Sequence, residues 1–255
     1  MCIRDRSLKV ESFSPLKNCL ENKTILLTGS GSGIGRTVAV TLAKYGAQLV
    51  LLSKDLPKLE GLHKEILGQG LKEPLIHSID FEYAEENEYQ QIKVAIQDRF
   101  ERLDGLINNA GILGEKKSLE QYNYSVWKKV MTVNLESPFL LTKTLLPLLN
   151  HSGLSSIIFT SSGVGKKGRA YWGAYAVSKF ATEGMMEVLA DELENTSNIR
   201  VNSVNPGPIR TKMRETAYPA EDPNTNPLPE TIMDLYIYLM SDDSEEIHGQ
   251  SINAQ

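Results

Sequence analysis

The chain has 255 residues, of which 41% are hydrophobic and 23% charged, and its formal net charge at pH 7 is −5. This is the composition of an ordinary globular protein, and the length fits one large α/β domain. No block of basic residues occurs, which argues against nucleic acid as a partner. No apolar run reaches membrane-spanning length, so we expect no membrane partner either.

Residues that bind metals or form disulfides are few and scattered. The two cysteines, Cys2 and Cys19, form no Cys-x-x-Cys pair, and the four histidines show no metal-ligand spacing. We therefore expect no metal site and a reducing compartment, taken to be the cytoplasm. Residues 1–21 carry little structural signal. They are expected to form a weakly structured N-terminal extension, followed by one domain at residues 22–255.

The first expected element is a buried strand at residues 24–28, whose apolar residues lead directly into a glycine-rich turn at residues 29–35. A helical pattern follows over residues 34–45. Strand, glycine turn and helix are the setting of a phosphate-binding loop, because glycines let backbone N–H groups approach a pyrophosphate and the helix dipole favours it. The spacing is Thr-Gly-x-x-x-Gly-x-Gly from Thr28, not G-x-G-x-x-G. Taken alone, it also suits a plain turn between strand and helix.

The residue after the second strand, expected at residues 48–53, discriminates between the two nicotinamide dinucleotides. An acidic side chain there would hydrogen-bond the ribose of NAD, whereas a basic one would pair with the 2′-phosphate of NADP. Lys54 occupies this position, and Asp55 follows as the expected N-cap of a helix over residues 56–67. Lys54 thus favours NADP(H) over NAD(H), but a register shift of one residue would reverse the preference. If Lys54 were only a solvated loop lysine, the sequence would indicate no cofactor preference.

Strands and helices alternate along the rest of the chain. Strands are expected at residues 74–79, 105–107, 155–160, 199–204 and 249–253, and helices at residues 85–100, 125–149, 173–193 and 229–240. This alternation predicts an α/β fold. We expect a single-domain Rossmann-type, doubly wound parallel sheet of about seven strands, with helices on both faces. Ligands of such folds bind at the carboxyl ends of the strands.

Two stretches of this pattern are irregular. Asn134 and Pro138 are poor residues for a helix interior, so the helix over residues 125–149 is expected to carry a kink or a functional constraint. The stretch at residues 212–229 is polar and rich in proline. That composition suits a mobile lid over a site.

A serine, a tyrosine and a lysine have spacings that suit proton transfer. Tyr175 and Lys179 are four residues apart, on one face of the expected helix. On its own, such a pair is usually a solvated surface pair. A protonated lysine this close would lower the pKa of the tyrosine toward neutrality. Ser162, thirteen residues before Tyr175, is expected at the end of a strand, meeting the tyrosine across a loop.

In this order, the motifs resemble those of the classical short-chain dehydrogenase/reductase family. The set comprises Thr-Gly-x-x-x-Gly-x-Gly at residues 28–35, Asn-Asn-Ala-Gly at 108–111, Ser162, Tyr-x-x-x-Lys at 175–179 and Pro-Gly at 206–207. The resemblance covers nearly the whole chain from residue 22 onward. Within the family, the run Gly-Ala-Tyr-Ala-Val-Ser-Lys-Phe-Ala-Thr-Glu-Gly-Met-Met from residue 173 resembles the YciK-type bacterial oxidoreductases.

The resemblance implies a catalytic set of four side chains. Tyr175 would be the general acid/base for a carbonyl or hydroxyl group. Lys179 would lower the pKa of Tyr175 and hydrogen-bond the nicotinamide ribose. Ser162 would hold and polarise the substrate oxygen. Asn134 would anchor a water that links Lys179 to solvent.

The resemblance also implies the cofactor contacts. The glycine turn would lie under the pyrophosphate, Asp80 would face the adenine, Asn108 the adenosine side, and Thr211 the nicotinamide carboxamide. The full expected set is Thr28, Gly29, Ser32, Gly33, Ile34, Gly35, Lys54, Asp80, Asn108, Ala110, Gly111, Tyr175, Lys179, Pro206, Gly207 and Thr211. Ser32 stands where NADP-preferring members often carry a basic residue, which leaves Lys54 as the main residue in favour of NADP.

The leading hypothesis is an NAD(P)(H)-dependent oxidoreductase that transfers a hydride between the cofactor and a small carbonyl or alcohol substrate. The alternative is a non-catalytic, dinucleotide-sensing regulatory protein, although such proteins commonly lose the tyrosine or the lysine. An extended-family epimerase or dehydratase is disfavoured because no room remains for a substrate domain beyond the sixth strand. The helices at residues 125–149 and 173–193 pair across a two-fold axis in relatives, so the resemblance implies a homodimer or homotetramer.

Overall fold

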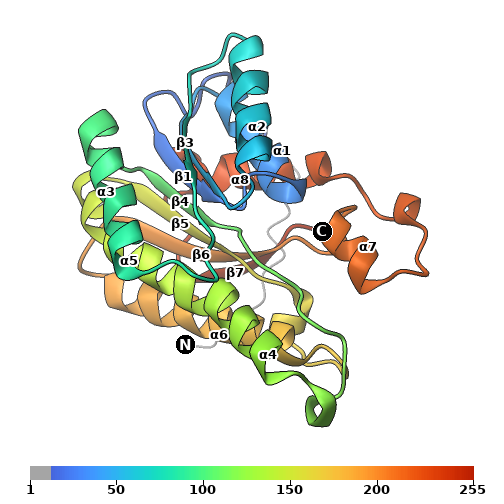
Figure 1. The fold of residues 1–255 in the computed structure, drawn as a ribbon. Coiled ribbons are helices and arrows are strands. Elements are labelled where there is room, and N and C mark those ends of the chain that lie inside the picture. Colours follow the sequence, from blue (N-terminus) through green and yellow to red (C-terminus); the bar gives the residue numbers. More distant parts are fainter. Residues whose placement is uncertain (1–12) are drawn as a thin grey trace.

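The computed structural model describes residues 13–255. Its centre is one parallel sheet of seven strands in the order β3-β2-β1-β4-β5-β6-β7 (Figure 1). The strand order runs outward from β1 to β3 on one side and from β4 to β7 on the other. This is the arrangement of a doubly wound sheet. The predicted fold class is confirmed.

The strands are short runs of mostly apolar residues. Their bounds are Thr24–Thr28 (β1), Gln48–Ser53 (β2), Leu75–Ser78 (β3), Gly105–Asn108 (β4), Ser155–Thr160 (β5), Ile199–Asn205 (β6) and Gln250–Asn253 (β7). Every residue of β1, β4 and β5 is buried. Burial on both faces is expected for parallel strands, because helices cover both sides of such a sheet.

Helices form one layer on each face (Figure 1). On one face, α1 (Gly33–Lys44), α2 (Leu56–Gly68) and α8 (Met233–Met240) share a buried apolar cluster with Leu27 of β1. On the other, α3 (Glu86–Phe100), α5 (Ser137–His151) and α6 (Gly173–Leu193) share a second cluster with Leu26. Neighbouring residues of β1 enter opposite clusters because successive strand side chains point to opposite faces.

The helix expected over residues 125–149 is interrupted. It consists of α4 (Tyr124–Met131), a π-helical turn (Thr132–Glu136) that contains Asn134, and α5. Pro138 has no N–H, so it cannot donate the usual helical hydrogen bond to the carbonyl of Asn134. The helix therefore changes locally to hydrogen bonds that span five residues, and Ser137 N–H donates to the carbonyl of Thr132. The expected distortion is present, and it takes the form of a π turn, which is frequent at functional sites.

The described end of the predicted N-terminal extension packs against the domain. Residues 1–12 lie outside the described residues, so the boundary at residue 21 stays a prediction. Leu20 is fully buried, and its N–H donates to the carbonyl of Tyr45 at 3.0 Å. The ring of Phe13 meets that of Tyr238 edge-on, with centroids 5.0 Å apart.

The segment expected as a lid has regular structure. It contains the short helix α7 (Lys212–Ala217), and Arg214 closes the following loop through an ion pair with Glu221 at 2.5 Å. The last expected helix begins as a 3-10 turn (Pro229–Ile232) and continues as α8. None of the helices in residues 13–255 combines the length and apolar character that a membrane span requires.

Candidate active site

A cavity of about 370 Å³ opens where the strand order reverses, at the carboxyl ends of β1 and β4. This is the position at which doubly wound sheets bind ligands, and the volume is typical of small-molecule sites. Many residues of the expected site line it: Gly29, Ser32, Gly33, Ile34, Gly35, Lys54, Asp80, Ala110, Gly111, Tyr175, Lys179, Pro206 and Thr211. Thr28, Asn108, Asn134, Ser162 and Gly207 do not line it directly.

The glycine turn brings backbone to the cavity. Gly29 has a φ of +68°, and a Cβ built on it would lie 2.9 Å from the Cα of Ala110, so a side chain there would force the two loops apart. Ser32 precedes α1 but its side chain makes no capping hydrogen bond. The first turn of α1, at Ile34 and Gly35, thus faces the cavity without a side-chain cap, which fits an anion such as a pyrophosphate.

The next helix provides a contrast. Asp55, the predicted cap of α2, does accept a hydrogen bond from the N–H of Lys58 at 3.1 Å. The N-terminus of α2 is therefore satisfied by the protein, whereas no side chain caps α1. Since the uncapped helix starts at the glycine turn, the residues present fit a dinucleotide at that place.

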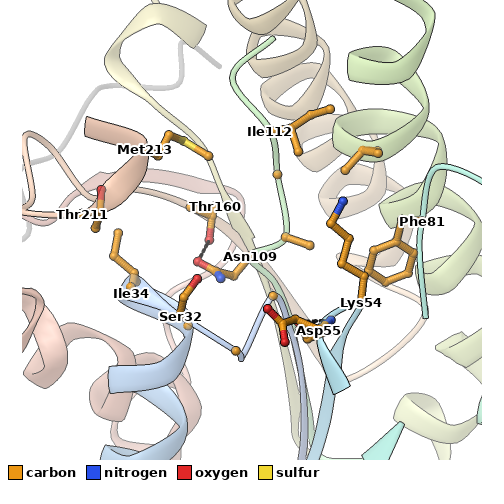
Figure 2. A pocket seen from close by; sticks show the side chains of 18 of the residues that line it. Ser32, Ile34, Lys54, Asp55, Phe81, Asn109, Ile112, Thr160, Thr211 and Met213 are labelled. Atoms are coloured by element: carbon orange, nitrogen blue, oxygen red, sulfur yellow. Dashed lines mark hydrogen bonds between the residues drawn. The ribbon is translucent and has the colours of Figure 1, made fainter. Parts of the chain in front are cut away.

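Thr28 and Asn109 hold the two central loops together. Thr28 Oγ1 accepts hydrogen bonds from the N–H groups of Asn109 and Ala110, both at 2.9 Å, and Asn109 Nδ2 donates to the carbonyl of Thr28 at 3.1 Å. Thr160 Oγ1 donates to Asn109 Oδ1 at 3.5 Å, the bond drawn in Figure 2. Thr28 therefore positions the loop that lines the cavity.

The two neighbouring asparagines after β4 have different places. Asn108 is buried behind the cavity, where its Nδ2 donates to Thr142 Oγ1 at 3.1 Å. Asn109, which is not in the predicted set, lines the cavity. The Asn-Asn pair in the sequence does not tell which of the two faces a ligand, because that depends on where the strand ends.

Ser162, Tyr175 and Lys179 come together at one end of the cavity. Tyr175 and Lys179 lie on the buried side of α6, with 8% and 5% of their surfaces exposed. A side-chain hydrogen bond joins Ser162 to Tyr175. Lys179 Nζ donates to the carbonyl of Thr160 at 2.7 Å and lies 5.8 Å from the centre of the Tyr175 ring. The grouping that the spacing suggested is therefore present.

The expected direction of the tyrosine's pKa shift is wrong for this structure. Burial raises the pKa of Tyr175, and only the hydrogen bond from Ser162 acts against it. Burial also lowers the pKa of Lys179 to about 8, with Glu183 acting in the opposite direction. The reason is that burial penalises every charged form, so proximity to a lysine does not by itself produce a phenolate.

Asn134 braces the loop after β4 against α6. Its Nδ2 donates to the carbonyl of Ile112 and to Ser178 Oγ, both at 3.0 Å, and its Oδ1 accepts from the N–H of Ile112 at 2.8 Å. A Cβ built on Gly111 would lie 3.4 Å from Asn134 Oδ1 and 3.7 Å from Lys179 Nζ. Asn134 thus lies beside the lysine, and its role in anchoring a water stays a prediction.

Two glycines outside the cavity lining fix the loops around it. A Cβ on Gly165 would lie 2.9 Å from the backbone of Lys179, so only a glycine lets the loop after Ser162 pack so closely on α6. Gly207 has a φ of +73°, and its N–H donates to Asn205 Oδ1 at 3.2 Å. It shapes the turn that carries Pro206 into the lining.

The opposite end of the cavity is open and polar. Lys54 follows β2 directly, and its Nζ lies 3.8 Å from Asp80 Oδ2, with 58% of the lysine side chain exposed. Figure 2 shows Lys54 and Phe81 on one side of the cavity and Ile34 and Thr211 on the other. Further lining residues were not predicted: Gly31, Ser53, Asp55, Lys58, Ile79, Phe81, Glu82, Asn109, Ile112, Lys129, Val133, Thr160, Ser161, Lys212 and Met213.

Some of these additional residues could have been found from the sequence, and others could not. Ser53 and Phe81 directly follow or precede predicted residues at strand ends, so sheet topology alone would include them. Lys129 and Met213 reach the cavity from α4 and α7. No motif marks them, because their position depends on how those helices pack.

A doubly wound sheet, a helix that starts without a side-chain cap at a glycine turn, and a Ser–Tyr–Lys cluster form the framework of a nucleotide-binding oxidoreductase. The family model described as short chain dehydrogenase matches residues 23–222. The chain belongs to the short-chain dehydrogenase/reductase family.

Similar proteins include the uncharacterized oxidoreductase YciK of Escherichia coli K12. It is 44% identical over 243 residues, which cover 95% of this chain and 96% of YciK. The predicted resemblance to YciK-type oxidoreductases is confirmed.

Two solved structures extend this comparison. A short chain dehydrogenase from Pseudomonas syringae has a TM-score of 0.94 and 47% identity, covering 96% of this chain and 99% of the other. A short chain dehydrogenase from Escherichia coli CFT073, solved in complex with NADPH, has a TM-score of 0.92 and 45% identity, covering 94% and 100%.

Proposed function

We propose that this chain is an NADP(H)-dependent oxidoreductase that interconverts a carbonyl group and an alcohol. The observation that carries the proposal is the buried pair Tyr175 and Lys179, with Ser162 hydrogen-bonded to the tyrosine, at one end of a cavity that has Lys54 at the other. When bound, the nicotinamide cofactor supplies or accepts the hydride. The glycine turn and the first turn of α1 would hold its pyrophosphate.

Tyr175 acts as the general acid when a carbonyl is reduced. Because burial raises its pKa, its hydroxyl is protonated at neutral pH and has a proton to give to the substrate oxygen. Ser162, which already hydrogen-bonds this hydroxyl, donates to the same oxygen as charge develops on it. In the reverse direction Tyr175 accepts the proton of the alcohol.

Lys179 stabilises the phenolate that remains after proton transfer. Its ammonium group lies near the tyrosine ring in an interior with little water, where a charge acts more strongly than it does in solvent. Its hydrogen bond to the carbonyl of Thr160 fixes the side chain in this position. The lysine therefore acts on the product of proton transfer rather than by ionising the tyrosine beforehand.

Lys54 selects NADP(H). Its position directly after β2 and its exposed ammonium group suit a phosphate on the adenosine ribose. Asp80 lies across from it and would keep the lysine oriented toward the cavity. A relative with 45% identity has been solved with NADPH, which supports the same choice here.

The exposed face of α6 supports the predicted homodimer or homotetramer. Val177, Phe180 and Val188 are exposed on α6, and Phe139 is exposed on α5. Exposed large apolar side chains are the kind of surface from which an interface between copies is built. Met185 and Leu189, by contrast, pack into the core. We propose that α5 and α6 form the contact between copies, in a protein that works in the cytoplasm.

Cofactor titration tests the proposal most directly. NADPH is expected to bind more tightly than NADH, followed by turnover with at least one member of a panel of ketones, aldehydes and alcohols. A dinucleotide-sensing protein would bind the cofactor and turn over none of them. Light scattering that shows only a monomer at micromolar concentration would contradict the proposed assembly.

A further inference from the structure

Glu183 is a buried carboxylate for which the proposed reaction has no role. It lies on α6 four residues after Lys179, with 8% of its surface exposed. One carboxylate oxygen, Oε2, accepts a hydrogen bond from Ser203 Oγ at 2.7 Å. The other, Oε1, is buried with no hydrogen-bond partner among the described residues. A carboxylate is costly to bury in this way unless a positive charge is close.

Lys179 and Glu183 reach the sheet at neighbouring positions. Lys179 contacts the carbonyl of Thr160 at the end of β5, and Glu183 contacts Ser203 in β6. The strand register pairs Thr160 with Val204 and Phe159 with Ser203. The two contact points are therefore one residue apart along the strands, a step of about 3.3 Å. The side chains cross the same gap between α6 and the sheet, side by side.

The groups that face Lys179 from the other elements are neutral. They are the carbonyl of Thr160 on β5 and the amide of Asn134 in the π turn, next to Gly111. Tyr236 packs on the opposite face of the sheet, and burial raises its pKa to about 12, so it stays uncharged. The titratable groups near the lysine among the described residues are thus Tyr175 and Glu183.

We propose that Glu183 is a positioning residue that keeps Lys179 protonated, by supplying the buried negative charge that compensates the ammonium group. The hydrogen bond from Ser203 orients the carboxylate, and Ser203 Oγ is in turn 2.9 Å from Ser251 Oγ on β7. A buried ammonium group without such a partner loses its proton more readily, because burial lowers its pKa. The inference rests on the proposed function, because only a charged Lys179 can stabilise the phenolate of Tyr175.

The electrostatics of the site agree with the geometry. Burial brings the pKa of Lys179 down to about 8, close to neutral pH, and Glu183 is the group that raises it. Without the carboxylate, the pKa of Lys179 would be lower still. The position one helical turn away gives Glu183 influence over the charge without contact with the substrate.

Titration of Lys179 by NMR tests the inference directly. The enzyme, carrying lysine labelled with 13C at Cε, is titrated without added nucleotide, and the Lys179 signal is assigned through Lys179→Met. We expect Glu183→Gln to lower the pKa of Lys179 by about one unit or more. Glu187→Gln removes an exposed carboxylate from the same helix and should leave this pKa unchanged.

Two variants separate charge from hydrogen bonding. Ser203→Ala removes the hydrogen bond but keeps the carboxylate, so the pKa of Lys179 should stay close to that of the wild type. Glu183→Asp keeps the charge, so the pKa of Lys179 should stay closer to that of the wild type than to that of Glu183→Gln. If Glu183→Gln does not fold, the combination Glu183→Met with Ser203→Ala removes the charge and its hydrogen-bond donor together. An unchanged pKa of Lys179 after loss of the charge overturns the inference, as does an equal shift in Ser203→Ala.

The pH dependence of turnover gives a second readout. The alkaline limb of the rate of carbonyl reduction should move to lower pH by the same amount in Glu183→Gln as the NMR titration shows. A wild-type enzyme that turns over no substrate would refute the proposed function. The NMR titration would still report on the lysine, so failure of the proposed function and failure of this inference are distinguishable.

Discussion

The two ends of the cavity use the same side chain in opposite ways. Lys54 is 58% exposed and lies 3.8 Å from Asp80, whereas Lys179 is 5% exposed and donates to a single carbonyl at 2.7 Å. Water screens the charge of Lys54, whereas the charge of Lys179 is poorly screened in the protein interior and interacts strongly with nearby groups. One lysine is thus suited to attract an anion from solvent, and the other to have its protonation set by its neighbours.

The largest expected effect is at the buried end. Tyr175→Phe removes only the hydroxyl that we propose transfers the proton, so turnover should fall about 1,000-fold or more, while NADPH binding stays within a few-fold. Turnover and cofactor fluorescence measure the two quantities. Tyr124→Phe, at an exposed tyrosine on α4, is the control and should change neither. Undiminished turnover in Tyr175→Phe would remove the basis of the mechanism.

At the exposed end, Lys54→Glu should weaken NADPH binding roughly 100-fold, because it replaces an attraction for the 2′-phosphate by a repulsion. NADH binding should change little, and rising salt should narrow the difference between the wild type and the variant. Isothermal titration with both cofactors measures this. Lys64→Glu changes the charge equally at an exposed site on α2 outside the cavity. If both variants lost the same affinity for NADPH, the overall charge of the protein and not Lys54 would select the cofactor.

The pH dependence of turnover sharpens the contrast further. Lys179 is charged below its pKa of about 8 and neutral above it. The rate of carbonyl reduction should therefore be highest below about pH 8 and fall about tenfold for each pH unit above it. Tyr175 cannot cause this limb, because burial places its pKa above the ordinary value of 10. A rate that stays flat up to pH 10 would contradict the role of the lysine.

The smallest expected effect is a difference in stability between variants at the N-termini of α1 and α2. Asp55→Ala removes the cap of α2 and should lower the free energy of unfolding by about 1 kcal/mol in urea denaturation. Ser32→Ala, before α1, removes no capping hydrogen bond and should leave that free energy unchanged. If both variants lost the same stability, the distinction between α2, which a side chain caps, and α1, which none caps, would be wrong.

The fold could be predicted from the sequence because its signals are local. The run at residues 24–28, the glycine turn and the helical pattern that follows each specify their own conformation, and the cap at Asp55 was found from its residue type and place. The grouping of Ser162, Tyr175 and Lys179 followed from spacing combined with resemblance. The kink near Asn134 was expected, but the helical pattern did not specify that it takes the form of a π turn.

Other parts of the site are set by burial, which the sequence does not show. The direction of the pKa shift of Tyr175 was wrong because the spacing reveals the lysine but not the loss of water. Asn109, rather than Asn108, lines the cavity because of where β4 ends, a matter of one residue. Lys129 and Glu183 carry no motif at all. Their places, Lys129 at the cavity and Glu183 buried between α6 and β6, depend on how the helices pack against the sheet.

The hydrogen bonds that join the central loops have a consequence for how the site assembles. Thr28 binds Asn109 across 81 residues of chain, Asn109 binds Thr160 across 51, and Lys179 returns to Thr160 across 19. A nascent chain that stops before β5 carries the whole glycine turn, but neither Thr160 nor the lysine. The glycine turn and the Ser162–Tyr175–Lys179 cluster are thus synthesised at different stages, and only the finished sheet joins them.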